Sequence, residues 1–494
     1  MLVMSIARGS LPAIAIERSA AKPLYQQIYD AYREAIVERR LTAGQRVAST
    51  RALATALNIS RIPVLTAFDQ LLAEGYFESR MGSGTFVSST LPGHAGFHKR
   101  PAARPGTRSL GTRSIASSTA GSLRSAREPW LNGLGAFRVS EPALDHFPFR
   151  TWSRLIARHS RGARREALYY GSPLGDLPFR QAVAAYLRTA RAVRCEAEQI
   201  MVVSGSQQAL EITARVLLDQ GQPVWVEEPG YRGARDALTM AGARLVPIPV
   251  DHEGLDVAAG IRMCRRARAA YVTPSHQYPL GVTMSASRRL QLLDWAQATG
   301  SWIIEDDYDS EYRYESQPIA ALQGLDHDTR VVYIGTFSKV LFPALRVGYL
   351  VIPPDLVDEF SAVREAMDIC PPALNQAVLT DFIVEGHFAR HVRRSSLLYR
   401  ERRSVLVESL RQMLGPTWRV VGAEAGIHLV ALRDRAGDRS ISQAAAREGI
   451  WVMPLSTCYL GTPRHHGLIL GYGGTTVAEI PKAIQRLRRV LRTN

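Results

Sequence analysis

The stretch that decides the fold is Val331-Val332-Tyr333-Ile334-Gly335-Thr336-Phe337-Ser338-Lys339, an apolar run that ends in small and hydroxylated residues before a lysine. Lys339 is one of four lysines in a chain with 61 Lys and Arg together, and it is the only lysine between residues 100 and 481. A lone lysine after a buried-looking strand points to chemistry, because an amine condenses with an aldehyde and a guanidinium does not. The alternative is a surface lysine in an arginine-rich chain.

Further short apolar runs alternate with helical stretches such as 207–218 and 287–299. The predicted strands are 200–203, 224–227, 270–273, 302–305, 331–334 and 347–352. Short β-branched strands separated by helices predict an α/β domain over 129–494, with a mainly parallel sheet that is covered on both faces.

The polar residues that follow these strands fall at one edge of the predicted sheet, where ligands of such folds bind. Ser206 and Gln207 begin a helix, whose free N–H groups suit a phosphate. Asp306 ends a strand, where an acid can pair with a protonated ring nitrogen. The remaining members are Tyr231, Tyr308, Thr336, Ser338, Lys339 and Arg346. Together these are the groups that a phosphorylated pyridine aldehyde requires.

Most of 129–494 resembles the fold-type I pyridoxal-phosphate enzymes of the aminotransferase class. The segments that carry the resemblance are Thr273-Pro274-Ser275-His276-Gln277-Tyr278-Pro279, Ile304-Glu305-Asp306-Asp307-Tyr308-Asp309-Ser310-Glu311 and Gly335-Thr336-Phe337-Ser338-Lys339. The resemblance implies pyridoxal 5'-phosphate as the cofactor and a small C-terminal subdomain. It further implies that Lys339 forms the imine, Asp306 pairs with the ring nitrogen, Tyr308 meets the phenolic oxygen and Tyr231 stacks on the ring. The implied phosphate cradle is Ser206, Gln207, Thr336, Ser338 and Arg346.

A second patterned segment, 15–88, predicts a winged helix-turn-helix domain. Helices are expected over 24–39, 50–57 and 61–74, and a hairpin over 76–87. Ser60 suits the N-cap of the third helix and Gly75 its C′ position. The third helix is expected to enter the major groove of double-stranded DNA.

This segment resembles the N-terminal domain of GntR-type bacterial regulators. The matching elements are Pro23-Leu24-Tyr25-Gln26-Gln27-Ile28, Gly44-Gln45-Arg46-Val47, Ser49-Thr50-Arg51-Ala52-Leu53-Ala54, Ser60-Arg61, Leu71-Leu72-Ala73-Glu74-Gly75-Tyr76 and Gly82-Ser83-Gly84-Thr85-Phe86-Val87. The resemblance implies DNA contacts by Arg51, Ser60, Arg61 and Gly82. The sequence departs from the family at Ile62-Pro63, where a threonine usually precedes Val64.

Charge separates the two parts of the chain. Residues 1–127 hold 17 Lys and Arg against 7 Asp and Glu, whereas the remaining 367 residues hold 44 against 38. A basic end on a nearly balanced body predicts a polyanion-binding module. Between them, 89–128 is rich in Pro, Gly, Ser, Thr and Arg, which predicts a flexible basic linker.

The whole chain resembles a MocR-type regulator, which implies a DNA-binding transcription regulator and a head-to-tail homodimer. In this hypothesis the imine on Lys339 senses a small-molecule effector, either an amine or the cofactor itself. One alternative is a working aminotransferase with an accessory DNA-binding domain. Another is a DNA-binding protein whose C-terminal part is only a dimerisation scaffold.

Two departures bear on that choice. Tyr278 stands where aminotransferases commonly place an Asn before Pro, so one ring contact is expected to be missing or replaced. The run Gly471-Tyr472-Gly473-Gly474 lacks the arginine that clamps a substrate carboxylate in aminotransferases. Efficient transamination is therefore not expected, although a residual half-reaction stays open.

The remaining composition excludes several classes of protein. Cys195, Cys264, Cys370 and Cys458 have no metal-binding or disulfide spacing, which fits a reducing cytoplasm. No stretch approaches the roughly 20 apolar residues of a membrane-spanning helix, and no secretory signal begins the chain. The pair His465-His466 is interpreted as loop surface rather than a metal site.

Overall fold

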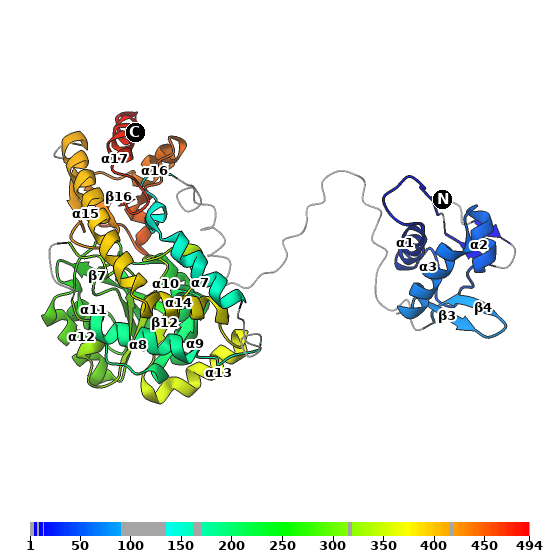
Figure 1. Cartoon of the computed structure of the whole chain (residues 1–494), viewed down its shortest axis with the longest axis horizontal. Coiled ribbons are helices and arrows are strands. Elements are labelled where there is room, and N and C mark those ends of the chain that lie inside the picture. Colours follow the sequence, from blue (N-terminus) through cyan, green and yellow to red (C-terminus); the bar gives the residue numbers. More distant parts are fainter. Residues whose placement is uncertain are drawn as a thin grey trace. The chain divides into compact units, whose positions relative to one another are not determined.

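The structure is a computed structural model that describes residues 4–6, 9–12, 14–89, 135–161, 169–314, 319–414 and 418–493. The chain forms two compact units, Met1–Arg113 and Ser114–Asn494, which are described separately (Figure 1). The linker predicted over 89–128 lies outside the described residues apart from Ser89. Its bounds and those of its neighbours therefore stay a prediction.

The N-terminal unit contains three helices and a hairpin, as the sequence predicts. Its elements are α1 (Leu24–Val37), α2 (Thr50–Ala56), α3 (Arg61–Ala73) and the antiparallel strands β3 (Phe77–Arg80) and β4 (Gly84–Val87), preceded by a short pair, β1 (Met4–Ile6) and β2 (Gly9–Leu11). The rings of Tyr32, Phe68 and Phe77 meet edge to face in the core, with centroids 5.1–5.5 Å apart. These contacts attach the hairpin to the helices, because aromatic pairs of this geometry are favourable beyond the area that they bury.

Serines begin the second and third helices in two different ways. The Ser49 hydroxyl at the start of α2 accepts a bond from the Ala52 amide at 3.2 Å. Ser60 occupies the N-cap position of α3, but its hydroxyl makes no capping bond to the described backbone. Gly75 follows α3 with φ of +77°, the left-handed conformation expected at C′.

The C-terminal unit is built on an eight-stranded sheet within the described residues, in the order β5-β12-β11-β10-β9-β6-β7-β8. The strands are β5 (Ile200–Val203), β6 (Pro223–Glu228), β7 (Arg244–Asp251), β8 (Gly254–Leu255), β9 (Ala269–Val272), β10 (Trp302–Asp307), β11 (Val331–Thr336) and β12 (Gly348–Val351). β7, β6, β9, β10 and β11 run parallel to one another, whereas β12 is antiparallel to both β11 and β5. The mainly parallel sheet is thus confirmed.

Helices cover both faces of this sheet because alternate strand residues face opposite sides. Met201 and Val203 pack with α9 (Ser206–Leu217), α10 (Arg232–Met240) and α13 (Val357–Asp368). Ile200 and Val202 face α8 (Leu177–Arg191) and α14 (Ala373–Val384). Further along that second face lie α11 (Val257–Cys264) and α12 (Ala286–Thr299).

The last part of the chain forms a smaller antiparallel sheet. Its strands, in the order β13-β14-β16-β15, are β13 (Trp418–Val421), β14 (His428–Arg433), β16 (His466–Gly471) and β15 (Met453–Pro454). The long helix α15 (His387–Leu414) leads into it, and α16 (Asp438–Arg447) and α17 (Glu479–Thr493) pack with it (Figure 1). α7 (Phe149–Arg161) packs against α14. No helix within the described ranges is long and apolar enough to cross a membrane.

Candidate functional site

All nine residues predicted at the edge of the sheet line one pocket. Its lining consists of Ser140, Ser206, Gln207, Tyr231, Tyr271, Thr273, Tyr278, Asp306, Tyr308, Thr336, Ser338, Lys339 and Arg346. The pocket lies where β5, β6, β9, β10 and β11 end. Parallel strands bring their carboxyl ends to one edge, so residues more than 100 positions apart in the sequence meet there.

The groups at one end of the pocket are of the kind that bind an anion. Ser206 and Gln207 begin α9, whose first N–H groups have no partner within the helix. Gly205 precedes them with φ of +93°, and a Cβ there would lie 3.2 Å from the Arg346 guanidinium. A side chain at position 205 would therefore crowd the Arg346 guanidinium, which donates a hydrogen bond to the Ser204 carbonyl. The helix start and the guanidinium supply partial and full positive charge to the same place.

Asp306 and Asp307 are neighbours on β10 and point to opposite sides of the sheet. Asp307 pairs with the buried Arg191 at 2.7 Å and accepts a hydrogen bond from the Tyr333 hydroxyl at 2.6 Å. Asp306 lines the pocket, where its Oδ2 accepts from the Tyr271 hydroxyl at 2.8 Å. Its Oδ1 is buried and has no partner among the described residues. Only Asp306 thus offers a carboxylate oxygen to a ligand.

Burial changes the acid–base properties of the site. It lowers the pKa of the Lys339 amine to about 8, against the opposing effects of Asp309 and Asp306. It also raises the pKa of Asp306 to about 7, although the hydrogen bond from Tyr271 works against that shift. A lysine of lowered pKa is partly neutral near pH 7, and the neutral amine is the nucleophile.

Aromatic residues form the wall of the pocket. Tyr231 meets Tyr278 edge to face at 5.6 Å, and its hydroxyl accepts from Gln207 Nε2 at 3.2 Å. Tyr278, which stands where an asparagine was expected, directs its hydroxyl to Met453 Sδ at 3.4 Å. Tyr278 itself lines the pocket, so an aromatic side chain stands where an amide was expected. Ile469 packs behind this wall.

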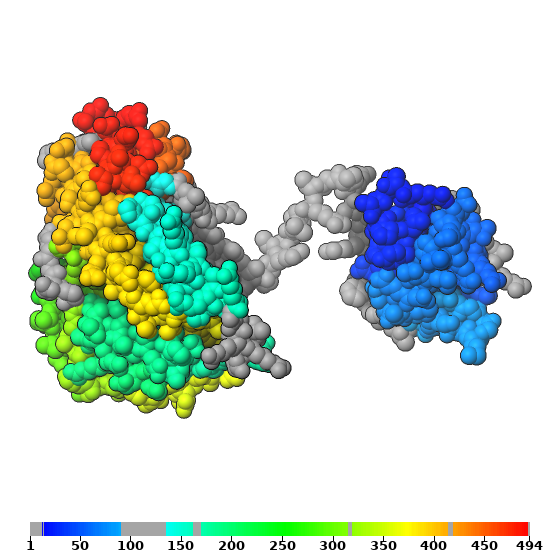
Figure 2. Space-filling model, viewed as in Figure 1, coloured from blue at the N-terminus to red at the C-terminus, as the bar shows by residue number. Residues whose placement is uncertain are grey.

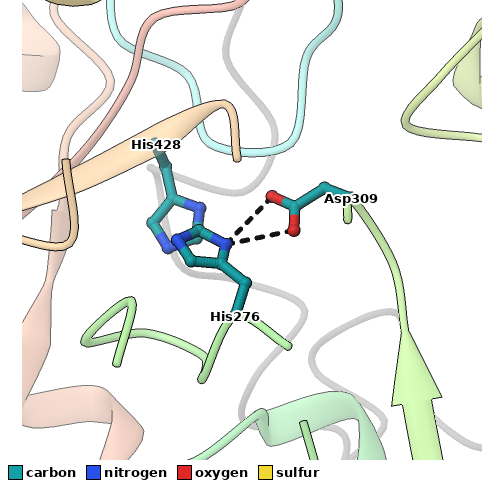
Figure 3. A group of neighbouring side chains, drawn as sticks. All are labelled: His276, Asp309 and His428. Carbon is teal, nitrogen blue, oxygen red and sulfur yellow. Dashed lines mark hydrogen bonds and ion pairs between the residues drawn. The ribbon is translucent and has the colours of Figure 1, made fainter. Parts of the chain in front are cut away.

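His276, Asp309 and His428 form a buried cluster (Figure 3). It adjoins Tyr308, whose hydroxyl lies 3.2 Å from His276 Nδ1. His276 Nδ1 lies 3.0 Å from Asp309 Oδ1, and the Tyr308 hydroxyl donates to the His276 carbonyl at 2.9 Å. Burial lowers the pKa of His428 to about 4, so its ring is neutral. The three side chains each bring a ligand atom within 4.8 Å of the others. Because His276 already bonds to Asp309 and His428 to the Pro279 carbonyl, we interpret the cluster as a hydrogen-bond network that positions Tyr308.

Three lining residues, Ser140, Tyr271 and Thr273, were not predicted at the site, and Tyr278 was noted only as a departure from the usual asparagine. Tyr271 and Thr273 come from β9 and its end, which was a predicted strand, so alternation along that strand could have found them. Ser140 carries no sequence signal, because the segment that contains it precedes the sheet by some 60 residues.

Gly474 stands where the arginine that clamps a carboxylate is expected, and it is not among the lining residues. A Cβ at this position would lie 2.9 Å from Glu141 Cδ. His466 is a correction, because it begins β16 and is half-buried, whereas His465 is exposed.

The predicted DNA-contact residues lie on the exposed surface of the N-terminal unit. Arg61 Nε donates to the Thr50 hydroxyl at 3.1 Å, which brings the starts of α2 and α3 together and places Arg51 and Ser60 beside them. Gly82 is at the tip of the β3–β4 hairpin with φ of +74°. Pro63 stands where a threonine usually precedes Val64, and its neighbour Ile62 is 73% exposed on α3. An exposed apolar residue on this helix suits contact with a thymine methyl group.

Comparison with known proteins matches both units. Residues 24–87 match the gntR family of bacterial regulatory proteins, and 137–487 match class I and II aminotransferases. MocR of Rhizobium meliloti, a probable rhizopine catabolism regulatory protein, is 42% identical over 96% of this chain and 95% of its own length. PdxR of Corynebacterium glutamicum, a pyridoxine biosynthesis transcriptional regulator, is 30% identical over 90% of this chain and 91% of its own. A Pyrococcus horikoshii kynurenine aminotransferase structure, in complex with PMP, covers 78% of this chain and 97% of its own, with a TM-score of 0.68 and 25% identity.

Proposed function

The chain belongs to the GntR family of bacterial regulators in its MocR-type form, and we propose that it is a transcription regulator that holds pyridoxal 5'-phosphate at Lys339. The cofactor supplies an aldehyde that reacts with primary amines. The observation that carries this proposal is the buried Oδ1 of Asp306, which lacks a donor among the described residues. A protonated ring nitrogen is such a donor, and it would remove the cost of an unpaired buried oxygen.

The other lining residues fit the rest of that molecule. Ser206, Gln207 and Arg346 would hold its phosphate, together with the hydroxyls of Thr336 and Ser338. The Ser338 hydroxyl is buried and has no partner among the described residues, so its O–H is available to donate to a phosphate oxygen. Tyr231 would stack on the ring. The Tyr308 hydroxyl would meet the phenolic oxygen, and the network of Asp309 and His276 would hold it in place. The amine of Lys339 would meet the aldehyde.

We propose an amine, or the cofactor itself, as the effector. The cations that line the pocket are Lys339 and Arg346, and Arg346 is beside the helix start that suits the phosphate. Among the residues that the structure describes, the lining therefore holds no further guanidinium for the carboxylate of an α-amino acid, which favours a sensor over an efficient aminotransferase. A relative that controls pyridoxine biosynthesis supports the cofactor as a candidate effector.

The regulator is proposed to act in the cytoplasm as a homodimer on double-stranded DNA. Arg51, Ser60, Arg61 and Gly82 are the proposed contacts with the operator. A dimer would present two copies of α3, and two half-sites one helical turn apart would match them.

Three measurements test the proposal. The purified protein should show a visible absorbance band that Lys339→Ala abolishes, and DNA affinity should change when pyridoxal 5'-phosphate or an amine is added. The absence of a band in the parent would refute cofactor binding. Repeated conversion of amino and keto acids at enzymatic rates would favour the aminotransferase alternative.

A further inference from the structure

We infer that the C-terminal unit has its own binding surface for the phosphates of duplex DNA, a cleft along α17. The cleft is lined by Gly135, Ala136, Gly449, Glu479, Lys482, Gln485, Arg486, Arg488, Arg489 and Arg492. Five of these side chains are cationic and one is anionic. This inference rests on the proposed function, because it assumes that the chain binds DNA through its N-terminal unit.

The cationic face of α17 follows from its sequence pattern. Ile480, Ala483, Ile484, Leu487 and Val490 recur at helical spacing and are buried against the small sheet and α15. Lys482, Arg488, Arg489 and Arg492 are exposed on the other side. Such a face is often only a solvated surface, so the charge distribution of the whole unit decides between the two interpretations.

That charge is concentrated in three helices. α7, α15 and α17 carry 16 Lys and Arg against 3 Asp and Glu, whereas residues 128–494 as a whole carry 44 against 38. Outside these helices the unit therefore has seven more acidic than basic residues. α17 packs against α15, and α14 packs against both α15 and α7. Figure 2 shows α7 in cyan, α15 in yellow to orange and α17 in red on one face of this unit.

The cations of α17 lack the carboxylate partners that some other surface arginines of the unit have. Elsewhere in the unit, Arg188 pairs with Glu196 at 2.8 Å and Arg215 with Glu211 at 2.8 Å. Within the described ranges, Lys482, Arg488, Arg489 and Arg492 form no ion pair with a carboxylate. Clustered like charges without counter-charges repel one another, and an external polyanion relieves that repulsion.

The position of the cleft identifies the polyanion. Gly135 and Ala136 line it, and these are the first described residues after the segment that joins this unit to the DNA-binding unit. The segment that tethers the DNA-binding unit therefore joins this unit beside the cleft. DNA held by that domain is a polyanion with one charge about every 1.7 Å of its axis, which is available at high local concentration. We conclude that flanking duplex, rather than a protein, occupies the cleft.

The test is the salt dependence of binding by the full-length protein to a mixed-sequence duplex of about 60 base pairs, roughly 200 Å long. A variant with Lys482, Arg488, Arg489 and Arg492 all changed to Gln should lower the slope of log affinity against log salt by about 2 to 4, since each lost phosphate contact removes about 0.9. Affinity near 0.15 M salt should fall about tenfold or more. Fluorescence anisotropy measures both quantities.

Two matched variants complete the design. Changing Arg488, Arg489 and Arg492 to Lys keeps the charge and should keep the slope. Changing Arg244, Arg262, Arg265 and Arg266 to Gln removes four exposed charges outside the three basic helices and should leave the slope unchanged. An unchanged slope in the α17 glutamine variant, in protein that keeps its cofactor band, would overturn the inference. The proposed function is tested separately: if the double variant Arg51→Gln with Arg61→Gln lost DNA binding, the proposed function would stand even where the inference about α17 failed.

Discussion

The lowered pKa of Lys339 gives a sharp prediction for how the apoprotein captures pyridoxal 5'-phosphate. An ordinary lysine has a pKa of 10.5, and burial lowers that of Lys339 to about 8. At pH 7 the neutral fraction of the amine is then about 9%, which is about 300-fold more than for an exposed lysine. The rate of covalent capture should therefore rise with pH and level off above about pH 8, instead of rising tenfold per pH unit up to about pH 10.

Asp309→Asn is the informative perturbation. The Asp309 carboxylate opposes the effect of burial and holds the pKa of Lys339 up, while asparagine still accepts a hydrogen bond from His276. The variant should reach its plateau at a lower pH than the parent, whereas Asp309→Glu, which keeps the charge, should move it little.

Stopped-flow absorbance after mixing apoprotein with the cofactor measures this rate. N-acetyl-lysine under the same conditions corrects for the ionisation of the cofactor itself, and Lys339→Ala gives the non-covalent background. A parent protein whose capture rate keeps climbing to pH 10 would refute the argument that burial activates the amine. A plateau that moves to higher pH in Asp309→Asn would refute the part assigned to the carboxylate.

Three further predictions concern single side chains. Asp306→Asn should weaken cofactor binding about tenfold or more in equilibrium dialysis, because a hydrogen bond to a charged group contributes about 1.5–3 kcal/mol. Asp307→Asn should instead lower the melting temperature, because it leaves the buried Arg191 without its charged partner. Arg346→Gln should weaken binding of pyridoxal 5'-phosphate but not of pyridoxal, and equal losses for both would contradict its assignment to the phosphate. Ser49→Ala should destabilise the N-terminal unit by about 1 kcal/mol in calorimetry, whereas Ser60→Ala, which loses no cap, should mainly reduce DNA affinity.

The sequence was most informative where strands are short, fully buried and followed by polar residues. The strands that begin at Ile200, Trp302 and Val331 have all their residues buried. No polar, solvent-facing residues interrupt their apolar runs, so each run could be recognised as a strand. The end of each such strand was then placed well enough to bring nine lining residues to one edge. The N-terminal unit was equally well predicted, because Ser49 and Ser60 precede its second and third helices and Gly75 follows the third.

Other elements escaped for physical reasons. β7 contains Pro247 and Pro249, which normally argue against a strand; it is tolerated because its outer partner, β8, is only two residues long. His428 enters the cluster beside Tyr308 from β14 in the small sheet. Its partner His276 lies 152 residues earlier, so no spacing in the sequence could have linked them. Spacing alone did not separate Asp306 from Asp307; the family resemblance selected Asp306, and in the folded sheet Asp306 is the one that lines the pocket.

The scarcity of lysine now has a physical interpretation that links the two ends of the chain. A regulator that binds an aldehyde cofactor and DNA needs one reactive amine at the cofactor site, but positively charged side chains at many phosphate contacts. Arginine contacts phosphates bidentately and does not form imines, so it can serve every phosphate contact without being modified. Of the three other lysines, Lys22 is paired with Asp30 and Lys482 lies among the arginines of α17. We infer that the small number of other lysines limits the reaction of the aldehyde with amines other than that of Lys339. Replacing Arg488 and Arg489 by Lys should therefore preserve DNA binding yet add sites that borohydride traps with the cofactor, which peptide mass mapping would reveal; labelling confined to Lys339 in that variant would remove this explanation of the lysine usage.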